Sequence, residues 1–494
     1  MVAIDPPAWV ADTVFYQVFP DRFARSGRVA PPGDLEPWDA PPTAHGFKGG
    51  DLHGVADRLD DLAELGVTGL VPTPVFAATS NHRYNAHDYL SVDPLLGGTE
   101  ALRRLIDEAH ERSIRVVLDG VFNHAGRGFL PFQHVLENGM QSPYRDWFYV
   151  DDDVRAGRRT IDAYPRAAGA SEHGFASWWG IPSLPKLRVQ HRPVREFLFG
   201  VAEHWLRFGI DGWRLDVPAD ITDPTFWPEF RDRVRAVKRD AYLVGEIWSE
   251  APEWLLGDRF DALMNYPLAL AILGYASAGR IDRGAAAGQN EYRDLLRPLD
   301  GAEFGERLRS LIDLHDPHVV AAQYNLIGSH DTPRARTVLG GDVAALRIAA
   351  LLLLTLPGAP TIYYGDELAM EGGPDPDCRR GLPADPDASA LAHRAFVRAA
   401  IHARHEHLAL RRGTVTIAGA AEGAVAIVRA ADGHRALVVA NSGREGARLA
   451  VDPSVAAWAR DAPPLDLPSI ASGRWVTATE LELPAQSALV VVSG

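Results

Sequence analysis

The stretch GWRLDV, residues 212–217, carries an arginine and an aspartate two positions apart in an otherwise apolar run. In a strand, side chains two positions apart share a face, so Arg214 and Asp216 would point one way and Trp213 the other. A helical pattern over residues 194–205 precedes the run, and helix followed by strand is the rhythm of a parallel sheet buried on both faces. Because a buried Arg–Asp pair is costly unless it is hydrogen-bonded, the pair indicates a functional site.

Seven other short apolar runs resemble this one, and most of the eight follow a helical pattern. The eight runs span residues 14–23, 67–74, 115–124, 212–217, 242–248, 260–267, 321–331 and 360–367. Eight alternating β and α units predict an α/β fold, a (β/α)₈ TIM barrel. Several runs end in polar groups, among them DGVFNH, RLDV and GEIW. Since the carboxyl ends of barrel strands form the active-site face, the site is expected there.

Two regions depart from this rhythm. Residues 125–190 contain no clear βα unit but many aromatic residues, which favours a folded insertion after the third strand that walls a cleft. After about residue 410, apolar and polar residues alternate around a hairpin-like ADG turn, which predicts a C-terminal antiparallel β-sandwich domain. The predicted organisation is a catalytic barrel over 1–124 and 191–408, an inserted domain B over 125–190 and the β-domain over 409–494.

Composition excludes several classes of partner. The 494-residue chain has a net charge of −15, which argues against nucleic acid and against an anionic membrane surface. The most apolar window, residues 345–360, is short and interrupted by Pro357, so it is interpreted as a buried helix. No signal-peptide pattern opens the chain, and the one cysteine, Cys378, forms no internal disulfide. We therefore expect a cytoplasmic protein.

Three carboxylates lie at predicted strand ends: Asp216, Glu246 and Asp331. Glycoside hydrolysis needs two carboxyl groups beside the scissile bond, one protonated and one ionised. Arg214 would keep Asp216 ionised by charge pairing, whereas the apolar neighbours of Glu246 suit a proton donor. Taken singly, each carboxylate is weak evidence, because a lone aspartate at a strand end is more often a helix cap or a loop residue.

A metal-dependent hydrolase is the rival interpretation, because His82, His124 and His330 accompany these carboxylates. The sequence contains no HExxH motif and no HxH pair on one predicted strand, so hydrogen bonding to sugar hydroxyls is favoured for the histidines. The glycines of GGDLHG and GGTE form neither a P-loop nor a dinucleotide fingerprint.

The runs DGVFNH, GWRLDV, GEIW and IGSHD, in this order, resemble the four signature regions of the α-amylase family, glycoside hydrolase family 13, whose members are retaining enzymes. The resemblance covers almost the whole chain. The stretches VFYQVFPDRF, SNHRYNAHDY, SLPKL, GDRFDALMNYP and GGPDPDCR are similar to the neopullulanase, cyclomaltodextrinase and maltogenic amylase group.

The resemblance implies a role for each matching residue. Asp216 would be the nucleophile that forms a covalent glycosyl-enzyme, and Glu246 the general acid and then the base. Asp331 would stabilise the transition state by holding sugar hydroxyls. Arg214 would orient Asp216 and pair with Asp119. Further substrate-binding residues implied are His82, Tyr84, His124, Trp178, Trp179, Trp248, His330, Asp375 and Arg379.

Three features depart from the group's pattern. The first strand starts near residue 14, without the preceding β-domain that the group uses for dimers, so a monomer or a homodimer by another route is expected. Residues 24–42 lack the dense Asn and Asp cluster that binds calcium in many relatives, so neither calcium nor another cofactor is expected. VPAD at 217–220 stands where the group typically has VANE, which leaves the preference between α-1,4 and α-1,6 linkages open.

The expected function is hydrolysis of short or cyclic α-glucans, such as cyclomaltodextrins, maltooligosaccharides or cyclic maltosyl-maltose. An exo-acting α-glucosidase, or a transglycosylase or isomerase that uses the same covalent intermediate, is the alternative. A non-catalytic sugar-binding scaffold is a third reading, against which the presence of all three carboxylates argues.

Overall fold

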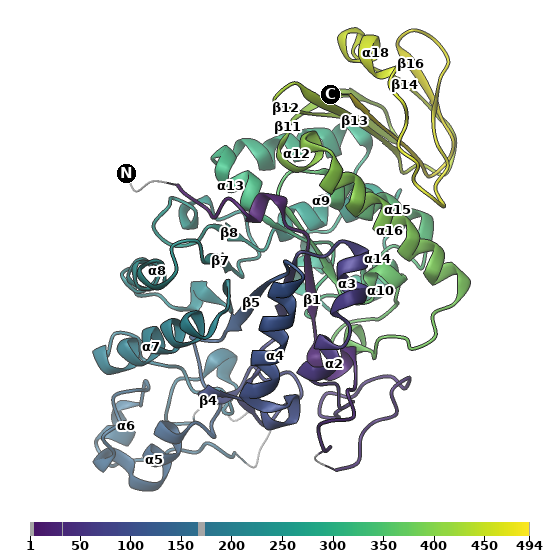
Figure 1. Ribbon diagram of the computed structural model, residues 1–494. Helices are drawn as coiled ribbons and strands as arrows, with labels where there is room; N and C mark the ends of the chain where they lie inside the picture. Colours follow the sequence, from purple (N-terminus) through teal and green to yellow (C-terminus); the bar gives the residue numbers. More distant parts are fainter. Residues whose placement is uncertain (1–3, 32, 166–172, 494) are drawn as a thin grey trace.

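A computed structural model describes residues 4–31, 33–165 and 173–493 and shows a barrel of eight parallel strands (Figure 1). The strands follow the order β8-β7-β6-β5-β2-β1-β10-β9, and a parallel bridge between Met264 and Tyr324 closes the ring. They are β1 Phe15–Val18, β2 Gly69–Pro72, β5 Arg115–Gly120, β6 Gly212–Leu215, β7 Tyr242–Gly245, β8 Ala262–Leu263, β9 Tyr324–Asn325 and β10 Ala359–Tyr363. Each predicted run overlaps one strand, so the predicted TIM barrel is confirmed.

The strands are shorter than the predicted runs, and this changes the place of two motifs. The DRF of the first run lies in a short helix, α1 (Pro20–Phe23), rather than at a strand end. The SHD of the seventh run lies in the loop beyond β9, which is only two residues long. Asp216 and Glu246 follow β6 and β7 directly, whereas Asp331 reaches the site from that loop.

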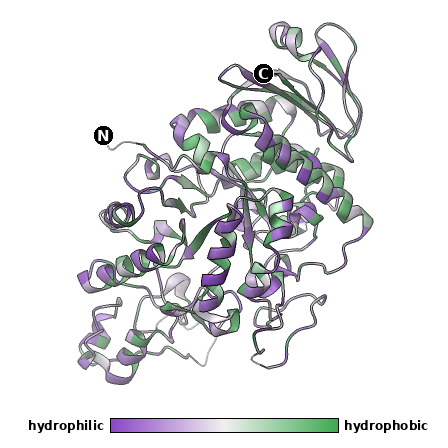
Figure 2. Ribbon diagram, viewed as in Figure 1, coloured by the Kyte–Doolittle hydropathy of each residue, from purple (hydrophilic) through white to green (hydrophobic). Residues whose placement is uncertain are grey.

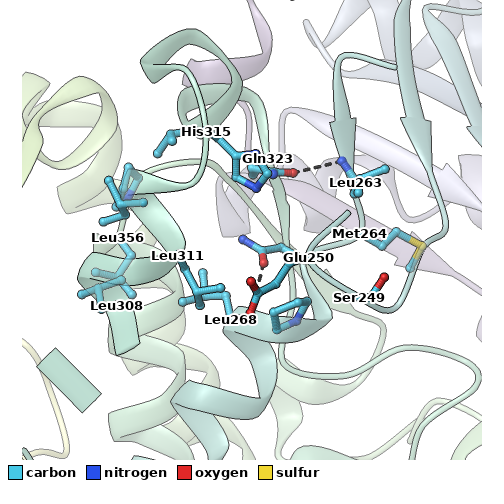
Figure 3. Close-up of a pocket in the computed structure, with 15 residues that line it drawn as sticks. Ser249, Glu250, Leu263, Met264, Leu268, Leu308, Leu311, His315, Gln323 and Leu356 are labelled. Carbon is cyan, nitrogen blue, oxygen red and sulfur yellow. Dashed lines mark hydrogen bonds between the residues drawn. The ribbon is translucent and has the colours of Figure 1, made fainter. Parts of the chain in front are cut away.

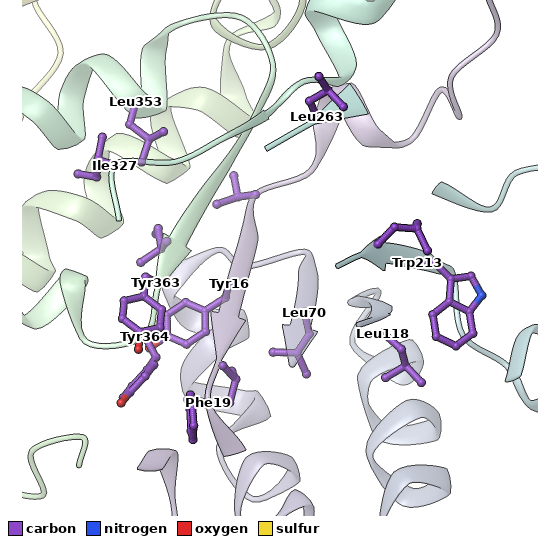
Figure 4. Packing of buried hydrophobic residues seen from close by; sticks show 14 of the residues in the cluster. Tyr16, Phe19, Leu70, Leu118, Trp213, Leu263, Ile327, Leu353, Tyr363 and Tyr364 are labelled. Carbon is purple, nitrogen blue, oxygen red and sulfur yellow. The ribbon is translucent and has the colours of Figure 1, made fainter. Parts of the chain in front are cut away.

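Alternating strand residues build two cores. The interior of the barrel is filled by side chains such as Phe15, Val71, Val117, Tyr242 and Val244. The opposite faces of the strands pack under the surrounding helices through Tyr16, Leu70, Leu118 and Trp213 (Figure 4). Within β6, Trp213 and Leu215 belong to this outer core, so Arg214 points to the inside, as the period-two pattern predicted.

The helices that surround the strands are mostly amphipathic. The longer ones are α4 Gly98–Glu111, α7 Arg192–Phe208, α8 Phe226–Val237, α9 Tyr266–Ala276, α12 Gly301–Asp313, α15 Val343–Thr355 and α16 Ala388–Glu406. Figure 2 shows hydrophilic and hydrophobic faces on helices such as α4, which buries Leu102, Leu105 and Ile106 against the barrel. The apolar window at 345–360 covers most of α15, a buried helix as predicted. Among the described residues, no helix is long and apolar enough to cross a membrane.

Residues 125–190, predicted as an insertion, contain α5 (Leu130–Asn138) and α6 (Asp152–Arg155), and residues 166–172 of this range lie outside the described residues. An aromatic core holds the segment together, since the ring of Phe132 lies 4.8 Å from that of Phe148 and 5.0 Å from that of Phe175. A backbone bridge between His124 and Lys186 joins it to the carboxyl end of β5. The segment therefore borders the face where the site was predicted.

The C-terminal region forms two antiparallel sheets that enclose an apolar core, which confirms the predicted β-domain. One sheet has β11 Thr414–Ala420, β12 Ala424–Ala431, β13 His434–Asn441 and β17 Ser487–Ser493, and the other has β14 Ala447–Ala450, β15 Arg474–Trp475 and β16 Glu480–Leu483. Asp432 and Gly433 of the ADG turn have φ of 46° and 84°, as a two-residue hairpin loop requires. The domain lies at the opposite end of the molecule from α5 and α6 (Figure 1).

Two fully buried arginines mark the junction between this domain and the barrel. Arg404 of α16 donates to the carbonyl oxygens of Leu354, Leu356 and Leu410 at 3.1, 3.0 and 2.9 Å. Arg429 of β12 donates to the carbonyl oxygen of Gly413 at 2.8 Å. These contacts pair the terminal nitrogens of both buried side chains with backbone oxygens.

Candidate active site

The centre of the site is Arg214, whose side chain is only 1% exposed. Its Nη1 donates to both carboxylate oxygens of Asp119 at 2.9 Å and to Oδ1 of Asp216 at 3.0 Å. Its Nη2 forms an ion pair with Oε2 of Glu246 at 2.9 Å. The expected contacts with Asp119 and Asp216 are present, and the contact with Glu246 is one that the sequence did not predict.

The sheet register brings these groups together. Asp119 on β5 pairs with Arg214 on β6, so the two side chains lie in the same layer of the barrel. The backbone amide of Asp216 donates to Gly120 O at 3.1 Å, and that of Glu246 donates to Leu215 O at 2.9 Å. Both carboxylates therefore extend the strand ladder by one residue, which fixes where their side chains begin.

Asp331 is held from two sides. Its Oδ2 lies 3.0 Å from Nε2 of His330, and its Oδ1 lies 3.2 Å from Nη2 of Arg379. The Nε of Arg379 donates to the backbone oxygen of His330 at 2.8 Å, and Nη1 forms an ion pair with Asp375 at 2.9 Å. Asp375 and Arg379 thus lie next to Asp331, and Arg379 helps to fix its carboxylate.

One tyrosine and three histidine side chains lie beside these carboxylates. The hydroxyl of Tyr84 donates to Asp119 at 2.8 Å and lies 2.6 Å from Nε2 of His330, whose ring is parallel to that of Tyr84 with centroids 5.3 Å apart. The centroid of the His82 ring lies 5.9 Å from that of Tyr84. The Nε2 atom of His124 lies 3.1 Å from the backbone oxygen of Tyr84. The four predicted residues form one cluster beside the carboxylates.

Trp248 lies directly beside the predicted acid. Its Nε1 donates to Oε1 of Glu246 at 3.3 Å. Its ring stacks on Tyr266, with centroids 3.6 Å apart. Tyr266 belongs to the MNYP stretch that was quoted for the family resemblance, but nothing in the sequence indicated that it would support this tryptophan.

Trp178 and Trp179 lie on the side of the insertion. The ring of Trp178 is stacked between those of His124, at 5.2 Å, and Trp179, at 4.7 Å. Trp178 also donates to Oδ2 of Asp220 at 2.7 Å. Lys186 donates to the backbone oxygen of Asp220 at 2.9 Å, so the unusual VPAD stretch anchors the insertion. Trp179 itself is 78% exposed and free to meet a ligand.

The electrostatics divide the three carboxylates into two kinds. Burial raises the pKa of Asp216 and of Glu246; Arg214 opposes the shift, and neighbouring carboxylates add to it. Burial also raises the pKa of Asp331, but His330 and Arg379 outweigh it, so its pKa is lowered overall. The sequence predicted that Arg214 ionises and orients Asp216 and pairs with Asp119; the structure adds Glu246, so three carboxylates share one guanidinium.

The arrangement suits Asp216 and Glu246 as two coupled carboxyl groups that share one proton. When Glu246 carries the proton, Asp216 remains a carboxylate with its hydrogen bond from Arg214. Glycoside hydrolysis requires one protonated and one ionised carboxyl group beside the scissile bond.

No cluster of three or more His, Cys, Asp or Glu side chains within 4–31, 33–165 and 173–493 is placed to hold a metal ion. In the segment after β1, the buried ammonium of Lys48 donates to the carbonyl oxygens of Pro37 and Ala40 at 2.6 and 2.7 Å and lies 4.0 Å from Oε2 of Glu36. A lysine thus provides a positive charge among oxygen atoms in this segment. That no calcium is needed stays a prediction.

Comparison with known proteins identifies the family. A family model described as the alpha amylase catalytic domain matches residues 17–406. The chain belongs to the α-amylase family. The cyclomaltodextrinase of Geobacillus thermopakistaniensis is 43% identical over 416 residues, which make up 84% of this chain and 66% of that relative. This member of the family thus spans slightly under two thirds of the length of that relative.

Two solved structures resemble this chain over their full length. The Nostoc punctiforme debranching enzyme has a TM-score of 0.88 and 39% identity, with 100% of both chains covered. The cyclic α-maltosyl-(1→6)-maltose hydrolase of Arthrobacter globiformis has a TM-score of 0.83 and 34% identity, with 99% of this chain and 100% of that chain covered. The resemblance to the cyclomaltodextrinase group that the sequence motifs indicated is confirmed.

Proposed function

We propose that this α-amylase family member is a retaining hydrolase that cleaves α-1,4 linkages, and α-1,6 linkages where they occur, in short or cyclic maltooligosaccharides. The observation that carries the proposal is the joint attachment of Asp216 and Glu246 to the two terminal nitrogens of Arg214. The guanidinium holds the two carboxyl groups close together at the barrel mouth, as a nucleophile and an acid acting on one bond must be.

In the first step, protonated Glu246 donates its proton to the glycosidic oxygen while a carboxylate oxygen of Asp216 attacks the anomeric carbon. The bond to the leaving sugar breaks, and that sugar departs as an alcohol. In the second step, the Glu246 carboxylate takes a proton from water, the water oxygen attacks the anomeric carbon, and the bond to Asp216 breaks. Both carboxyl groups thereby return to their starting states.

Asp331 stays ionised through this cycle because its pKa is lowered by His330 and Arg379. We assign it, with His330, to the hydroxyls of the sugar that is attacked. Tyr84, His82 and His124 border the same position and would complete the polar wall around it.

The size of the substrate is proposed from relatives. The names cyclomaltodextrinase and cyclic α-maltosyl-(1→6)-maltose hydrolase belong to two proteins similar to this chain. Both names describe small cyclic α-glucans, which agrees with the expectation from the sequence. The exposed ring of Trp179, backed by Trp178, offers an apolar face at the rim that a sugar ring could cover.

The proposal is tested with purified protein and β-cyclodextrin, a cyclic maltosyl-maltose, maltotriose and pullulan, with Asp216→Asn as the matched inactive control. We expect rapid ring opening to linear oligomers, with products released first as the α-anomer in proton NMR spectra. Intact rings together with glucose released from linear ends would contradict the proposal and support an exo-acting α-glucosidase. Longer products that accumulate at the expense of hydrolysis would support a transglycosylase.

A further inference from the structure

The turn that follows β6 contains a strained residue. Val217, directly after Asp216, has φ of 35° and ψ of 51°, in the left-handed region. A β-branched residue rarely adopts this conformation, and the ring of Pro218 restricts the residue before it further. Strain of this kind persists only where the surrounding structure enforces it, and it collects at functional sites. The contacts of Val217 therefore bear on function.

The backbone amide of Val217 points at the proposed acid. It donates to Oε2 of Glu246 at 3.1 Å, and Nη2 of Arg214 forms its 2.9 Å ion pair with the same oxygen. The other oxygen, Oε1, accepts only the longer hydrogen bond from Trp248, at 3.3 Å, among the described residues. A proton binds less well to an oxygen that already faces an N–H donor and a cation. Oε1 is therefore the oxygen left to carry the proton.

Contacts from outside the carboxylate cluster fix the turn. The amide of Asp220 donates to the carbonyl oxygen of Val217 at 3.1 Å, which closes the short helix η5 (Pro218–Asp220). The indole of Trp227, on α8, donates to the carbonyl oxygen of Pro218 at 3.0 Å. Asp220 also accepts the two hydrogen bonds from the insertion that are described above. The strained conformation is thus held by α8 and by the insertion.

A second turn has the same backbone conformation but a different setting. Ala251, in the loop after β7, has φ of 36° and ψ of 54° and also precedes a proline, Pro252. Within the part of the chain that the structure describes, its amide donates to no carboxylate. The two residues before it, Ser249 and Glu250, line a cavity of about 30 Å³ (Figure 3), the share of one water molecule in the liquid. The carboxylate acceptor is therefore particular to Val217 and does not come with the turn.

We propose that the backbone amide of Val217 is a positioning group for the acid: it holds Oε2 of Glu246, so that Oε1 delivers the proton to the glycosidic oxygen. The inference rests on the proposed function and adds which oxygen delivers the proton and what keeps the carboxyl group turned that way. In the second step, Oε1 takes the proton from water, and the same hydrogen bond stabilises the carboxylate until then. Burial raises the pKa of Glu246, and the amide opposes that rise.

The test replaces the amide N–H with an ester oxygen, by incorporating the α-hydroxy acid that corresponds to valine at position 217. The carbonyl oxygen of Asp216, which becomes the ester carbonyl, accepts no hydrogen bond from the described residues, so the exchange removes one contact. The matched control is the same exchange at Ala251. We compare kcat/KM for the best glucan substrate of the four named above with that for α-maltosyl fluoride, whose fluoride departs with little help from an acid.

The ester at position 217 should lower kcat/KM for the glucan about tenfold and leave that for α-maltosyl fluoride within about twofold. The alkaline limb of the glucan pH profile, which reports loss of the Glu246 proton, should move up by about one pH unit, because the carboxylate loses a donor. The ester at Ala251 should change neither quantity. The exchange leaves in place the other titratable groups that face Glu246, namely Arg214, Asp216, Tyr266, His330 and Asp331.

Three outcomes would overturn the inference. Equal losses with both substrates and an unshifted limb would mean that the turn is only structural. No loss at all would mean that the amide does not act on Glu246. In both of these cases the proposed function stands. If the parent protein cleaves none of the four glucans, the proposed function is wrong and the inference falls with it.

A second measurement uses the parent chain and does not need the ester protein to fold. In protein that contains isotope-labelled valine, the amide resonance of Val217 is identified by its absence from Val217→Ala. This resonance should move with pH as Glu246 titrates, and the movement should be lost in Glu246→Gln. A resonance that does not move, or that moves equally in Glu246→Gln, would overturn the inference.

Discussion

The mouth of the barrel and its junction with the C-terminal domain both bury arginine completely, but they give it different partners. At the mouth, Arg214 contacts the carboxylates of Asp119, Asp216 and Glu246. At the junction, the acceptors of Arg404 and Arg429 are backbone carbonyl oxygens. The residue type and the degree of burial are the same, and only the charge of the surroundings differs.

The pKa values show what this difference means. Burial lowers the pKa of Arg214, but Asp119 and Glu246 more than compensate, so the guanidinium is firmly charged. Burial lowers the pKa of Arg404 to about 9, and the partly exposed Asp12 opposes this shift only in part. The carboxylates around Arg214 are groups that can take up or release a proton, whereas the carbonyl oxygens around Arg404 cannot. Under the proposed function, the first arrangement serves chemistry and the second serves stability.

The largest effect should come from Asp216→Asn. Turnover should fall on the order of 10⁴-fold or more, because the amide cannot form the glycosyl ester. The melting temperature should stay the same or rise, since one of three crowded carboxylates is removed. Product formation and thermal unfolding measure the two effects. If the Asp216→Asn protein unfolds, the cluster around Arg214 also serves stability. If it keeps substantial activity, Asp216 is not the nucleophile.

The reverse result is expected for Arg404→Met. Three or more buried carbonyl oxygens lose their donor, so the free energy of unfolding should fall by about 3–5 kcal/mol. The kcat of the molecules that remain folded should not change. Denaturant unfolding, together with kcat per folded molecule, tests this. Arg398→Met, on the same helix but with a side chain 47% exposed, is the control and should cost at most about 1 kcal/mol.

Glu367 is an intermediate case: a buried carboxyl group, just beyond β10, whose hydrogen-bond donors are Tyr16 and the amide of Gly365. Burial raises its pKa to about 7, from an ordinary value of 4.5. The contribution of Glu367 to the free energy of unfolding is therefore fully present below pH 4.5. It is lost as the pH rises through 7, by about 3 kcal/mol at most. Glu367→Gln should remove this loss. Unfolding curves of both proteins from pH 4.5 to 8 should diverge; a constant difference would show that Glu367 does not titrate in this range.

The smallest effect concerns Lys48, a cation held by carbonyl oxygens at the catalytic end. Because the ammonium already lies among these oxygens, neither EDTA nor added calcium should change the melting temperature or activity measurably. Lys48→Met, which removes the charge, should cost on the order of 1 kcal/mol and lower the melting temperature by about one degree, because the shift per kcal/mol becomes smaller as the chain becomes longer. Stabilisation of the parent protein by calcium, reversed by EDTA, would show that this segment binds metal after all.

The sequence predicted the fold well, because each barrel strand leaves a local signal. The period of two in GWRLDV predicted the orientations of Trp213 and Arg214 before any contact was known. The order of the motifs then indicated that Asp216, Glu246 and Asp331 belong to one site. The motifs did not reveal which side chains touch. Nothing in GEIW shows that Glu246 shares Arg214 with Asp216, since that contact depends on the neighbouring strand.

Arg404 and Arg429 could not be predicted for another reason. Their partners are backbone oxygens, which every residue possesses, so no side-chain motif accompanies them. Lys48 was missed in the same way. The sequence also did not predict that β8 and β9 are only two residues long. Apolar runs indicate burial, but they do not reveal how many residues form hydrogen bonds with the neighbouring strand.

The alternation within β6 has a consequence for how this chain tolerates change over generations. A substitution at Gly212–Leu215 alters one side chain, but deletion of a single residue would exchange the two faces of the strand. The indole of Trp213 would then enter the barrel, and the guanidinium would turn toward the helices. Insertions and deletions should therefore be rare in this strand and more common in surface loops, because the register of one short strand sets the positions of the active-site side chains.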